Sequence, residues 1–140
     1  MPMTDYQRNH LADREFGRAT GNSTPATYYI ALSTTTPSVN GTGFTEPAGA
    51  GYARVPIQNN KTTGFGSAVN GVVQNINTHQ FPDSTAPWGT ITHWFISDSQ
   101  VGGNPLYYGA LAEQILVITN SRIFIDAGAV QFEVGNLPAL

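Results

Sequence analysis

The segment that decides the fold is Trp88-Gly-Thr-Ile-Thr-His-Trp-Phe-Ile-Ser97, a run of β-favouring residues with a period of two. Trp94 and Ile96 share one face of this run, whereas His93 and Phe95 lie on the other. Because neither face is plainly polar, both faces are expected to be covered by other parts of the chain. The segment is therefore predicted to be a central strand of a sheet.

Shorter segments with the same period stand on both sides of this strand, and turn signals separate them. Asn70-Gly71 is typical of a tight hairpin turn, and Pro56 inside one segment indicates an edge strand or a bulge. Together these segments predict an all-β fold, a single antiparallel β-sandwich of either jelly-roll or immunoglobulin-like topology. The other predicted strands cover residues 26–33, 52–58, 65–69, 72–77, 106–111, 122–124 and 129–134.

A short N-terminal α-helix is expected before the strands, over residues 4–17. Thr4 followed by Gln7 is a capping-box pattern, and Gly17 can end the helix. Most of the charge of the first quarter of the chain lies here, so the helix is expected to be solvated on most of its circumference. The predicted division is an N-terminal helix or arm over 1–20 and a β-sandwich domain over 21–140.

Both ends of the chain carry candidate interface residues. Tyr6, His10 and Leu11 fall at helical spacing, and such a helix often packs on a neighbouring molecule. At the other end Leu137 and Leu140 are apolar side chains that are unlikely to be left in water. We therefore predict that the helix or the C-terminal residues contact another subunit.

Composition excludes several classes of partner. Charged residues make up 11% of the 140 residues, the net charge is −3, and only six side chains are basic. A chain without a basic patch lacks the electrostatic footprint of nucleic-acid binding or of attachment to an anionic membrane, so neither partner is expected. The first ten residues lack the basic head and apolar run of a signal peptide, which favours synthesis in the cytosol. The absence of cysteine removes redox sensitivity.

Catalytic and metal-ligating residues do not form a recognisable constellation. His10, His79 and His93 are far apart in the sequence, and only an accident of folding would bring His79 to Asp83 and Asp98. No Gly-x-Ser-x-Gly motif and no cysteine offers a nucleophile. The sequence therefore predicts no metal, no cofactor and no enzymatic activity, with a polysaccharide hydrolase as the weakest alternative.

Aromatic side chains leave a second alternative open. Tyr29, Trp88, Tyr107 and Tyr108 could be exposed and, with neighbouring Asn and Asp, form a platform on which sugar rings stack. Most of the aromatic residues fall at core-facing positions of strands, so packing is the favoured interpretation for the set. A carbohydrate-binding module that recognises a host surface is the alternative function.

The order of the segments resembles that of the small virion proteins of tailed bacteriophages often labelled phage tail fibre proteins. The motifs that carry the resemblance are the loop Glu46-Pro-Ala-Gly-Ala-Gly-Tyr-Ala-Arg54, the strand Trp88-Gly-Thr-Ile-Thr-His-Trp94 and the segment Gly102-Gly-Asn-Pro-Leu-Tyr-Tyr-Gly-Ala-Leu111. They follow the N-terminal helix and Tyr28-Tyr-Ile-Ala-Leu-Ser33, and the resemblance covers roughly residues 5–134.

The resemblance implies a non-enzymatic structural protein of the virion, made in the cytoplasm of the bacterial host. It would be one of many copies, as a capsid decoration or cement protein or as a component of a tail fibre or baseplate. The implied partners are other copies of the chain, plausibly as a trimer, and the major capsid protein or tail and baseplate proteins. A distal fibre is the less favoured location, because a receptor-reaching shaft needs length that a chain without repeats lacks.

Overall fold

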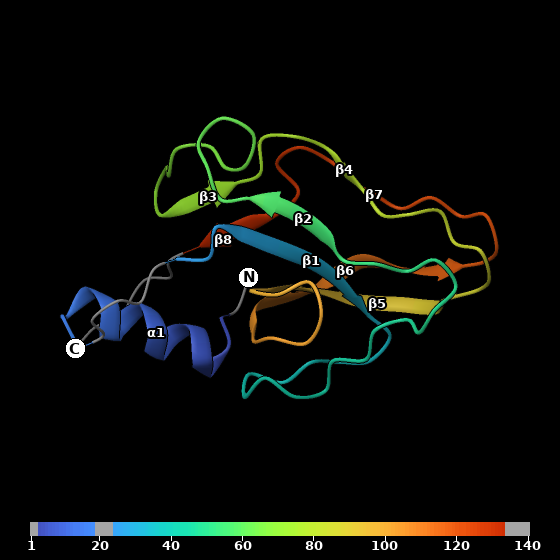
Figure 1. The fold of residues 1–140 in the computed structure, drawn as a ribbon, viewed down its shortest axis with the longest axis horizontal. Coiled ribbons are helices and arrows are strands. Elements are labelled where there is room, and N and C mark those ends of the chain that lie inside the picture. The colour runs from blue at the N-terminus through green and yellow to red at the C-terminus, as the bar shows by residue number, and fades with distance from the viewer. Residues whose placement is uncertain (1–2, 19–23, 134–140) are drawn as a thin grey trace.

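The structure, a computed structural model, describes residues 3–18 and 24–133, and within these ranges one helix precedes eight strands (Figure 1). This confirms the predicted all-β fold with a short N-terminal helix. The elements are α1 (Asp5–Glu15), β1 (Thr27–Ser33), β2 (Val55–Gln58), β3 (Val72–Gln74), β4 (His79–Gln80), β5 (Gly89–Ser97), β6 (Pro105–Val117), β7 (Phe124–Ile125) and β8 (Gln131–Glu133).

The main sheet has four antiparallel strands in the order β2-β1-β5-β6. β5 lies between β1 and β6, which confirms that the segment from Trp88 to Ser97 holds the central strand. β2 is an edge strand, and its Pro56 is exposed, as expected for a residue that cannot donate to a ladder. Both positions follow from local signals in the sequence. The two-residue period indicates the central strand β5, and the missing N–H group of Pro56 indicates the edge strand β2.

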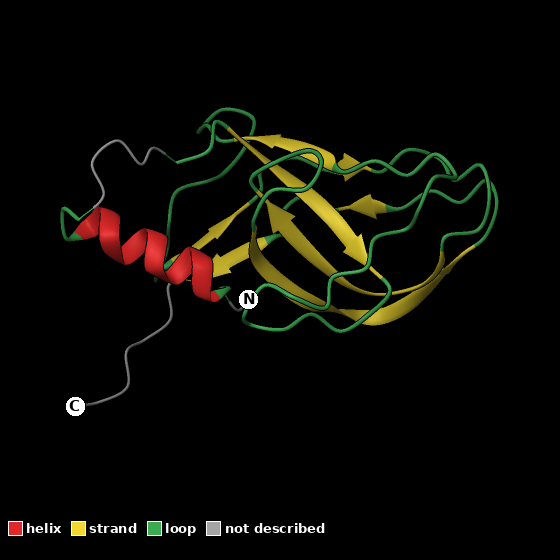
Figure 2. Cartoon of the chain, turned by 60° about the horizontal axis from the view of Figure 1, so that its bottom comes forward, coloured by secondary structure: helices red, strands yellow, loops and turns green. Residues whose placement is uncertain are grey.

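A second layer covers one face of this sheet (Figures 1 and 2). It is not a continuous sheet but two antiparallel two-stranded ladders, β3-β8 and β4-β7. The buried core lies between the layers, where Ile30, Ile91 and Ile96 of the main sheet pack with Phe81 and Val130. The molecule is thus a two-layer antiparallel structure whose second layer is split.

The helix is fixed to β6 of its own chain through its first turn. Thr4 is fully buried; its hydroxyl accepts from the Gln7 N–H at 3.3 Å, and its own N–H donates to the Leu106 carbonyl at 2.9 Å. Gln7 does not complete the capping box, because its side-chain amide donates to the Tyr107 hydroxyl instead, at 3.1 Å. Thr4 and Gln7 thereby pack the helix on its own β6, whereas the sequence favoured packing on a neighbour.

Strand β6 is longer than predicted. The sequence predicts a strand over residues 106–111, whereas the structure extends it to Val117. The pairing with β5 jumps from His93↔Ala110 to Ile91↔Ile115, so Thr92 alone faces the four residues 111–114. A bulge of this size interrupts the two-residue period, which is the reason that the pattern fails to indicate the second half of the strand.

Candidate assembly surfaces

The predicted interface residues of the helix are divided between two environments. Tyr6 is 45% exposed, and its ring stacks on that of His10 at a centroid distance of 6.1 Å. Leu11 faces the β-structure and lines a hollow described below. Leu137 and Leu140 lie outside the described residues, so the predicted role of the C-terminus in assembly remains a prediction.

The four aromatic residues considered for sugar stacking do not gather on one surface. Trp88 is buried, with 6% of its surface exposed, which rules out the alternative that it is an exposed binding residue. Its indole N–H donates to the Ala50 carbonyl at 2.9 Å, and this burial removes the ring from a binding platform. Tyr107 and Tyr108 are consecutive in β6 and project to opposite faces of the sheet. Tyr29 is half-buried in β1.

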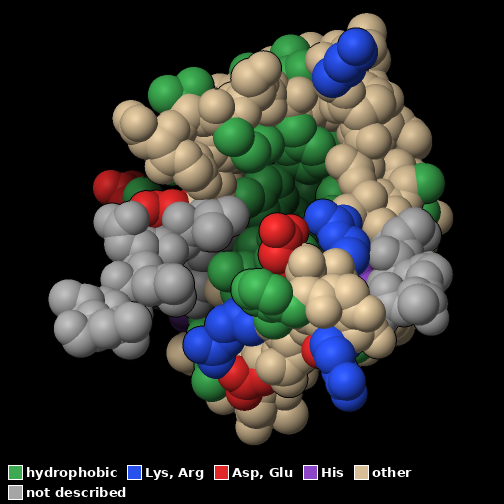
Figure 3. Space-filling model, turned by 90° about the vertical axis from the view of Figure 1, so that its left-hand side faces the viewer, with side chains coloured by type: hydrophobic (Ala, Val, Ile, Leu, Met, Phe, Trp, Pro, Cys, Tyr) green, Lys and Arg blue, Asp and Glu red, His purple; other side chains and the backbone are tan. Residues whose placement is uncertain are grey.

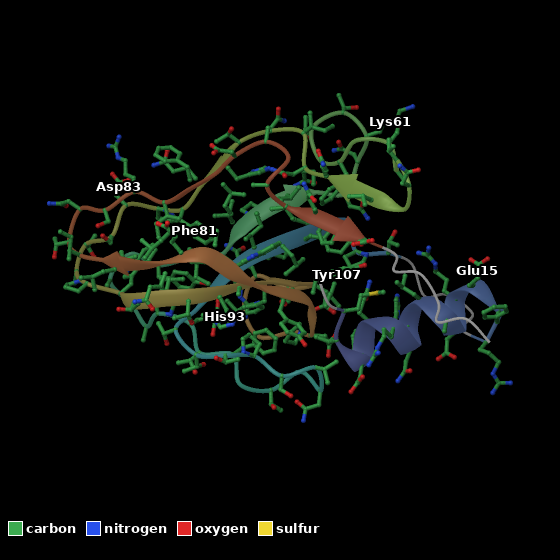
Figure 4. All side chains as sticks on the ribbon, turned by 180° about the vertical axis from the view of Figure 1, so that it is seen from behind. Glu15, Lys61, Phe81, Asp83, His93 and Tyr107 are labelled. Carbon is green, nitrogen blue, oxygen red and sulfur yellow. The ribbon has the colours of Figure 1, made fainter. Side chains whose placement is uncertain are left out.

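The candidate catalytic residues Asp83, Asp98 and His93 have local structural partners, whereas the buried Nε2 of His79 lacks a hydrogen bond to any described residue. The Asp83 carboxylate accepts from Arg122 at 3.1 Å, and the Asp98 carboxylate accepts from the Asn104 N–H at 2.7 Å. His93 shares a hydrogen bond with Thr92, and Figure 4 shows His93 and Asp83 on opposite sides of the layers. Over residues 3–18 and 24–133, no group of three His, Asp or Glu side chains has the geometry of a metal site.

An aromatic hollow lies between α1 and the β3-β8 ladder, and we use this name for it below. It has a volume of about 310 Å³, and Figure 3 shows its apolar floor from the α1 end of the molecule. Four rings form the floor in edge-on and tilted contacts, with Tyr107 4.6 Å and Phe65 5.3 Å from Phe132 between centroids. The residues that shape it include Leu11, Tyr28, Phe65, Val73, Tyr107 and Phe132.

Charge at the aromatic hollow comes from the helix. Burial raises the pKa of both Tyr28 and Tyr107, whereas the positive charge of Arg14 acts in the opposite direction on both phenols. Arg14 therefore lies within electrostatic range of the hollow, and no ion pair joins it to another described residue. The hollow combines an apolar floor with a cation near its rim.

A second apolar surface, the β6 edge surface, is defined by Ile115, Leu116, Ile118 and Phe124. The exposed fractions of Leu116, Ile118 and Phe124 are 66%, 59% and 55%. Ile115 and Phe124 also line a cleft of about 420 Å³ that opens between the end of β6 and the β4-β7 ladder. Since β6 is the edge strand of its sheet, the backbone N–H and C=O groups on its outer side along this surface can form hydrogen bonds with another strand.

The motif from Glu46 to Arg54 forms a structural network on the other face of the sheet. Arg54 is buried and donates to both carboxylate oxygens of Glu46, at 2.9 and 2.8 Å. The Tyr52 hydroxyl donates to the same carboxylate at 2.7 Å. Arg54 also donates to the carbonyls of Ser99 and Gly102, so it ties the motif to the β5–β6 turn. The sequence contains the motif, but its spacing alone does not reveal that Arg54 pairs with Glu46.

The comparisons agree with a structural role. No helix in the described ranges is long and apolar enough to cross a membrane. A comparison with curated proteins finds no match. The resemblance to phage tail fibre proteins is confirmed by a family match that covers nearly the whole chain. Over residues 2–133 the chain matches the family described as podophage GP4 fiber I protein gp80, so it belongs to this family of phage fibre proteins.

Proposed function

We propose that the protein is a non-enzymatic structural subunit of a phage fibre, present in several copies that join through the β6 edge surface. Membership of the fibre family gives it a structural role in the virion. The observation that carries the proposal is the exposure of Leu116 and Ile118 beside an open strand edge. Large apolar side chains gathered at one place on a surface are typical of protein–protein contacts.

Beyond the residues that Met3 and Thr4 pair with and the bulge at residues 111–114, the edge of β6 carries no charged side chain that would oppose pairing. Natural edge strands carry lysine or inward charges, or are very short, whereas β6 has 13 residues and Glu113 as its one charged side chain. A strand from another copy that adds to this edge would satisfy the outer backbone groups. The side chains of the added strand would contact Leu116 on one face of the sheet and Ile115 on the other face. A chain with a net charge of −3 opposes such contacts only weakly.

A place near the base of the fibre suits the size of the subunit. A 15.0 kDa two-layer module without repeats is too short to form a reaching shaft alone. We propose that its contacts are with two other copies in a trimer and with tail or baseplate proteins. A decoration or cement position on the capsid is the alternative, and cryo-electron microscopy of intact particles distinguishes the two by where the density of the subunit lies.

The β6 contact is tested by the mass of the purified protein in solution. Wild type is expected to sediment as a multimer at tens of micromolar, a concentration at which modest interfaces are occupied. Leu116→Lys places a charge in the contact and is expected to shift the protein to its monomer mass. Val101→Lys is the matched control, because Val101 is 85% exposed on the β5–β6 turn and lies outside the surface. A wild-type monomer, or an unchanged mass for Leu116→Lys, would overturn the proposal.

A further inference from the structure

We propose that the ring of Phe16 in one copy inserts into the cleft between β6 and the β4-β7 ladder of a second copy. This space is called the β7 cleft below. The contact rests on the proposed function in requiring several copies to be present, and it lies beside the β6 edge surface without including Leu116. It would join the α1 end of one molecule to the opposite end of the next.

Phe16 is the most exposed aromatic side chain within residues 3–18 and 24–133, with 80% of its surface open. It is the C-cap residue of α1, and its backbone N–H donates to the Ala12 carbonyl, so the last turn of the helix fixes its position. A single exposed apolar side chain needs no explanation by itself. It gains meaning when a pocket of suitable size exists elsewhere on the same protein, because the two can then form a contact between copies.

The β7 cleft is such a pocket, and it is preformed. Its volume of about 420 Å³ lies within the range of ligand pockets. Its lining includes the buried core residues Leu32 and Ile91 and the half-buried ring of Trp94. Ala112 and Ala129 also line it, and both are exposed, so short side chains leave its mouth open. An aromatic ring that packs against Trp94 is stabilised by more than the apolar area that it buries.

The cleft is continuous with the surface already proposed for assembly. Ile115 and Phe124 belong both to the β6 edge surface and to the lining of the cleft. A second copy that covers this edge would therefore close the cleft as well. Closing it empty would leave an apolar void whose lining lacks dispersion contacts on one side. A ring inserted from the partner restores those contacts, which favours a large apolar occupant.

Charge at the two sides of the contact is complementary. Asp126 is the one charged residue among those that line the cleft, and it forms no ion pair with a described residue. Arg18 follows Phe16 by two residues, is exposed, and likewise has no ion pair in the described ranges. Two residues span at most about 7 Å, so the Arg18 side chain would lie at the mouth of a cleft that holds the Phe16 ring.

The positions of the two parts assign them to different copies. Figure 4 shows Glu15, the residue before Phe16, at the opposite end of the molecule from Asp83, which follows β4. β4 pairs with β7, whose Phe124 and Ile125 line the cleft. The Phe16 ring therefore faces the cleft of another molecule and not its own. Such a head-to-tail contact closes into a ring, a trimer included, where the rotation between copies allows.

The self-association constant of the full-length protein, measured by sedimentation over a concentration series, tests the insertion of the ring. Phe16→Ala is expected to weaken association about tenfold or more, as truncation of an aromatic anchor in a pocket commonly does. Ala129→Trp should have a similar effect, because its own ring would fill the cleft. Val101→Ala is the matched control, since Val101 is 85% exposed and does not line the cleft.

Reversal of charge tests the orientation of the contact. Arg18→Asp and Asp126→Arg are each expected to weaken association about fivefold, the effect of a partly exposed ion pair. The double variant carries both reversed charges on every copy, so the pair is re-formed between copies with its signs exchanged. Its association constant is expected to return close to that of wild type.

Two results would overturn the β7-cleft contact. One is an association constant for Phe16→Ala and Ala129→Trp equal to that of Val101→Ala. The other is a charge-reversed double variant that associates no more tightly than the weaker single variant. If Leu116→Lys still disrupts the multimer, either result removes this contact and leaves the proposed function intact. If Phe16→Ala dissociates the multimer and Leu116→Lys does not, the β6 pairing fails and the β7-cleft contact stands. A wild-type monomer overturns both.

Discussion

Replacing Arg54 by alanine is expected to be among the most destabilising polar substitutions in the chain. Arg54 makes four hydrogen bonds, two to the Glu46 carboxylate and two to backbone carbonyls, and its guanidinium lies 5.4 Å from the centre of the Phe95 ring. Its side chain is 7% exposed, so the pair is formed largely away from water. Breaking a buried pair by removing one partner costs about 3–5 kcal/mol.

The structure places the cost at the lower end of this range. The Glu46 side chain is 28% exposed, so its carboxylate can be rehydrated after Arg54 is removed, and we expect a loss of about 3 kcal/mol. For a domain of this size that loss lowers the melting temperature by roughly 10 °C. Glu46→Gln leaves the more deeply buried Arg54 guanidinium without its partner charge and should cost at least as much as Arg54→Ala. The double variant should cost less than the sum of the two single losses, because the two side chains act as one unit.

Urea unfolding followed by tryptophan fluorescence measures these losses, with an unchanged m-value as the check on two-state behaviour. The control is Arg122→Ala, which breaks an exposed pair with Asp83 and should cost about 0–1 kcal/mol. A loss for Arg54→Ala as small as that of Arg122→Ala, or costs that simply add in the double variant, would refute the reasoning.

Acid gives an independent test of the same pair. Burial alone would raise the pKa of Glu46, but hydrogen bonds from Arg54 and Tyr52 outweigh it and hold the pKa below its ordinary value. The pair therefore stabilises the fold above the unfolded pKa of about 4.5, and this contribution is lost as pH falls through the lower folded pKa. Glu46→Gln should make the acid loss of stability shallower, as urea midpoints measured at several pH values will show.

Three further substitutions test other parts of the fold. Burial lowers the pKa of His79, so stability should fall as pH drops below about 6.5, and His79→Gln should flatten this slope in urea unfolding. Trp88→Ala should cost about 3–5 kcal/mol in thermal unfolding, because the ring is part of the core; a value near zero would contradict its burial. A Cβ on Gly64 would lie 1.9 Å from the Gln58 carbonyl oxygen, so Gly64→Ala should lower the melting temperature strongly. Gly49→Ala is the control, because a Cβ there meets no atom and costs only the backbone strain of about 1–2 kcal/mol.

The elements predicted correctly are those whose signals are local. Thr4 and Gly17 mark the two ends of the helix, Pro56 marks an edge, and the period of β5 marks a strand covered on both faces. Each of these predictions depends on the conformational preference of one residue or on a short pattern of neighbouring residues. The sequence favours core packing for the aromatic residues as a set but leaves open whether Trp88 is exposed. Trp88 packs in the core and its indole N–H donates to the carbonyl of Ala50, which is distant in the chain, and no local pattern reveals that contact.

The candidate assembly surfaces were only partly predictable. Leu11 of α1 was identified from helical spacing, and it does line the aromatic hollow, but Tyr28, Tyr107 and Phe132 reach the same place from three strands. Only the folded chain brings them together. The β6 edge surface escaped prediction because the bulge in residues 111–114 hides the strand that carries Leu116.

The N-terminal residues add a geometric limit to any assembly through β6. Met3 bridges to Tyr107, and the Thr4 N–H donates to Leu106, both on the side of β6 that faces away from β5. The first part of that edge is therefore already occupied by the chain itself, and an incoming strand can pair only beyond it. In the proposed assembly these contacts would act as a register stop, because every copy that adds to the edge would have to stop at the same position, and the register between subunits would then be set within each subunit.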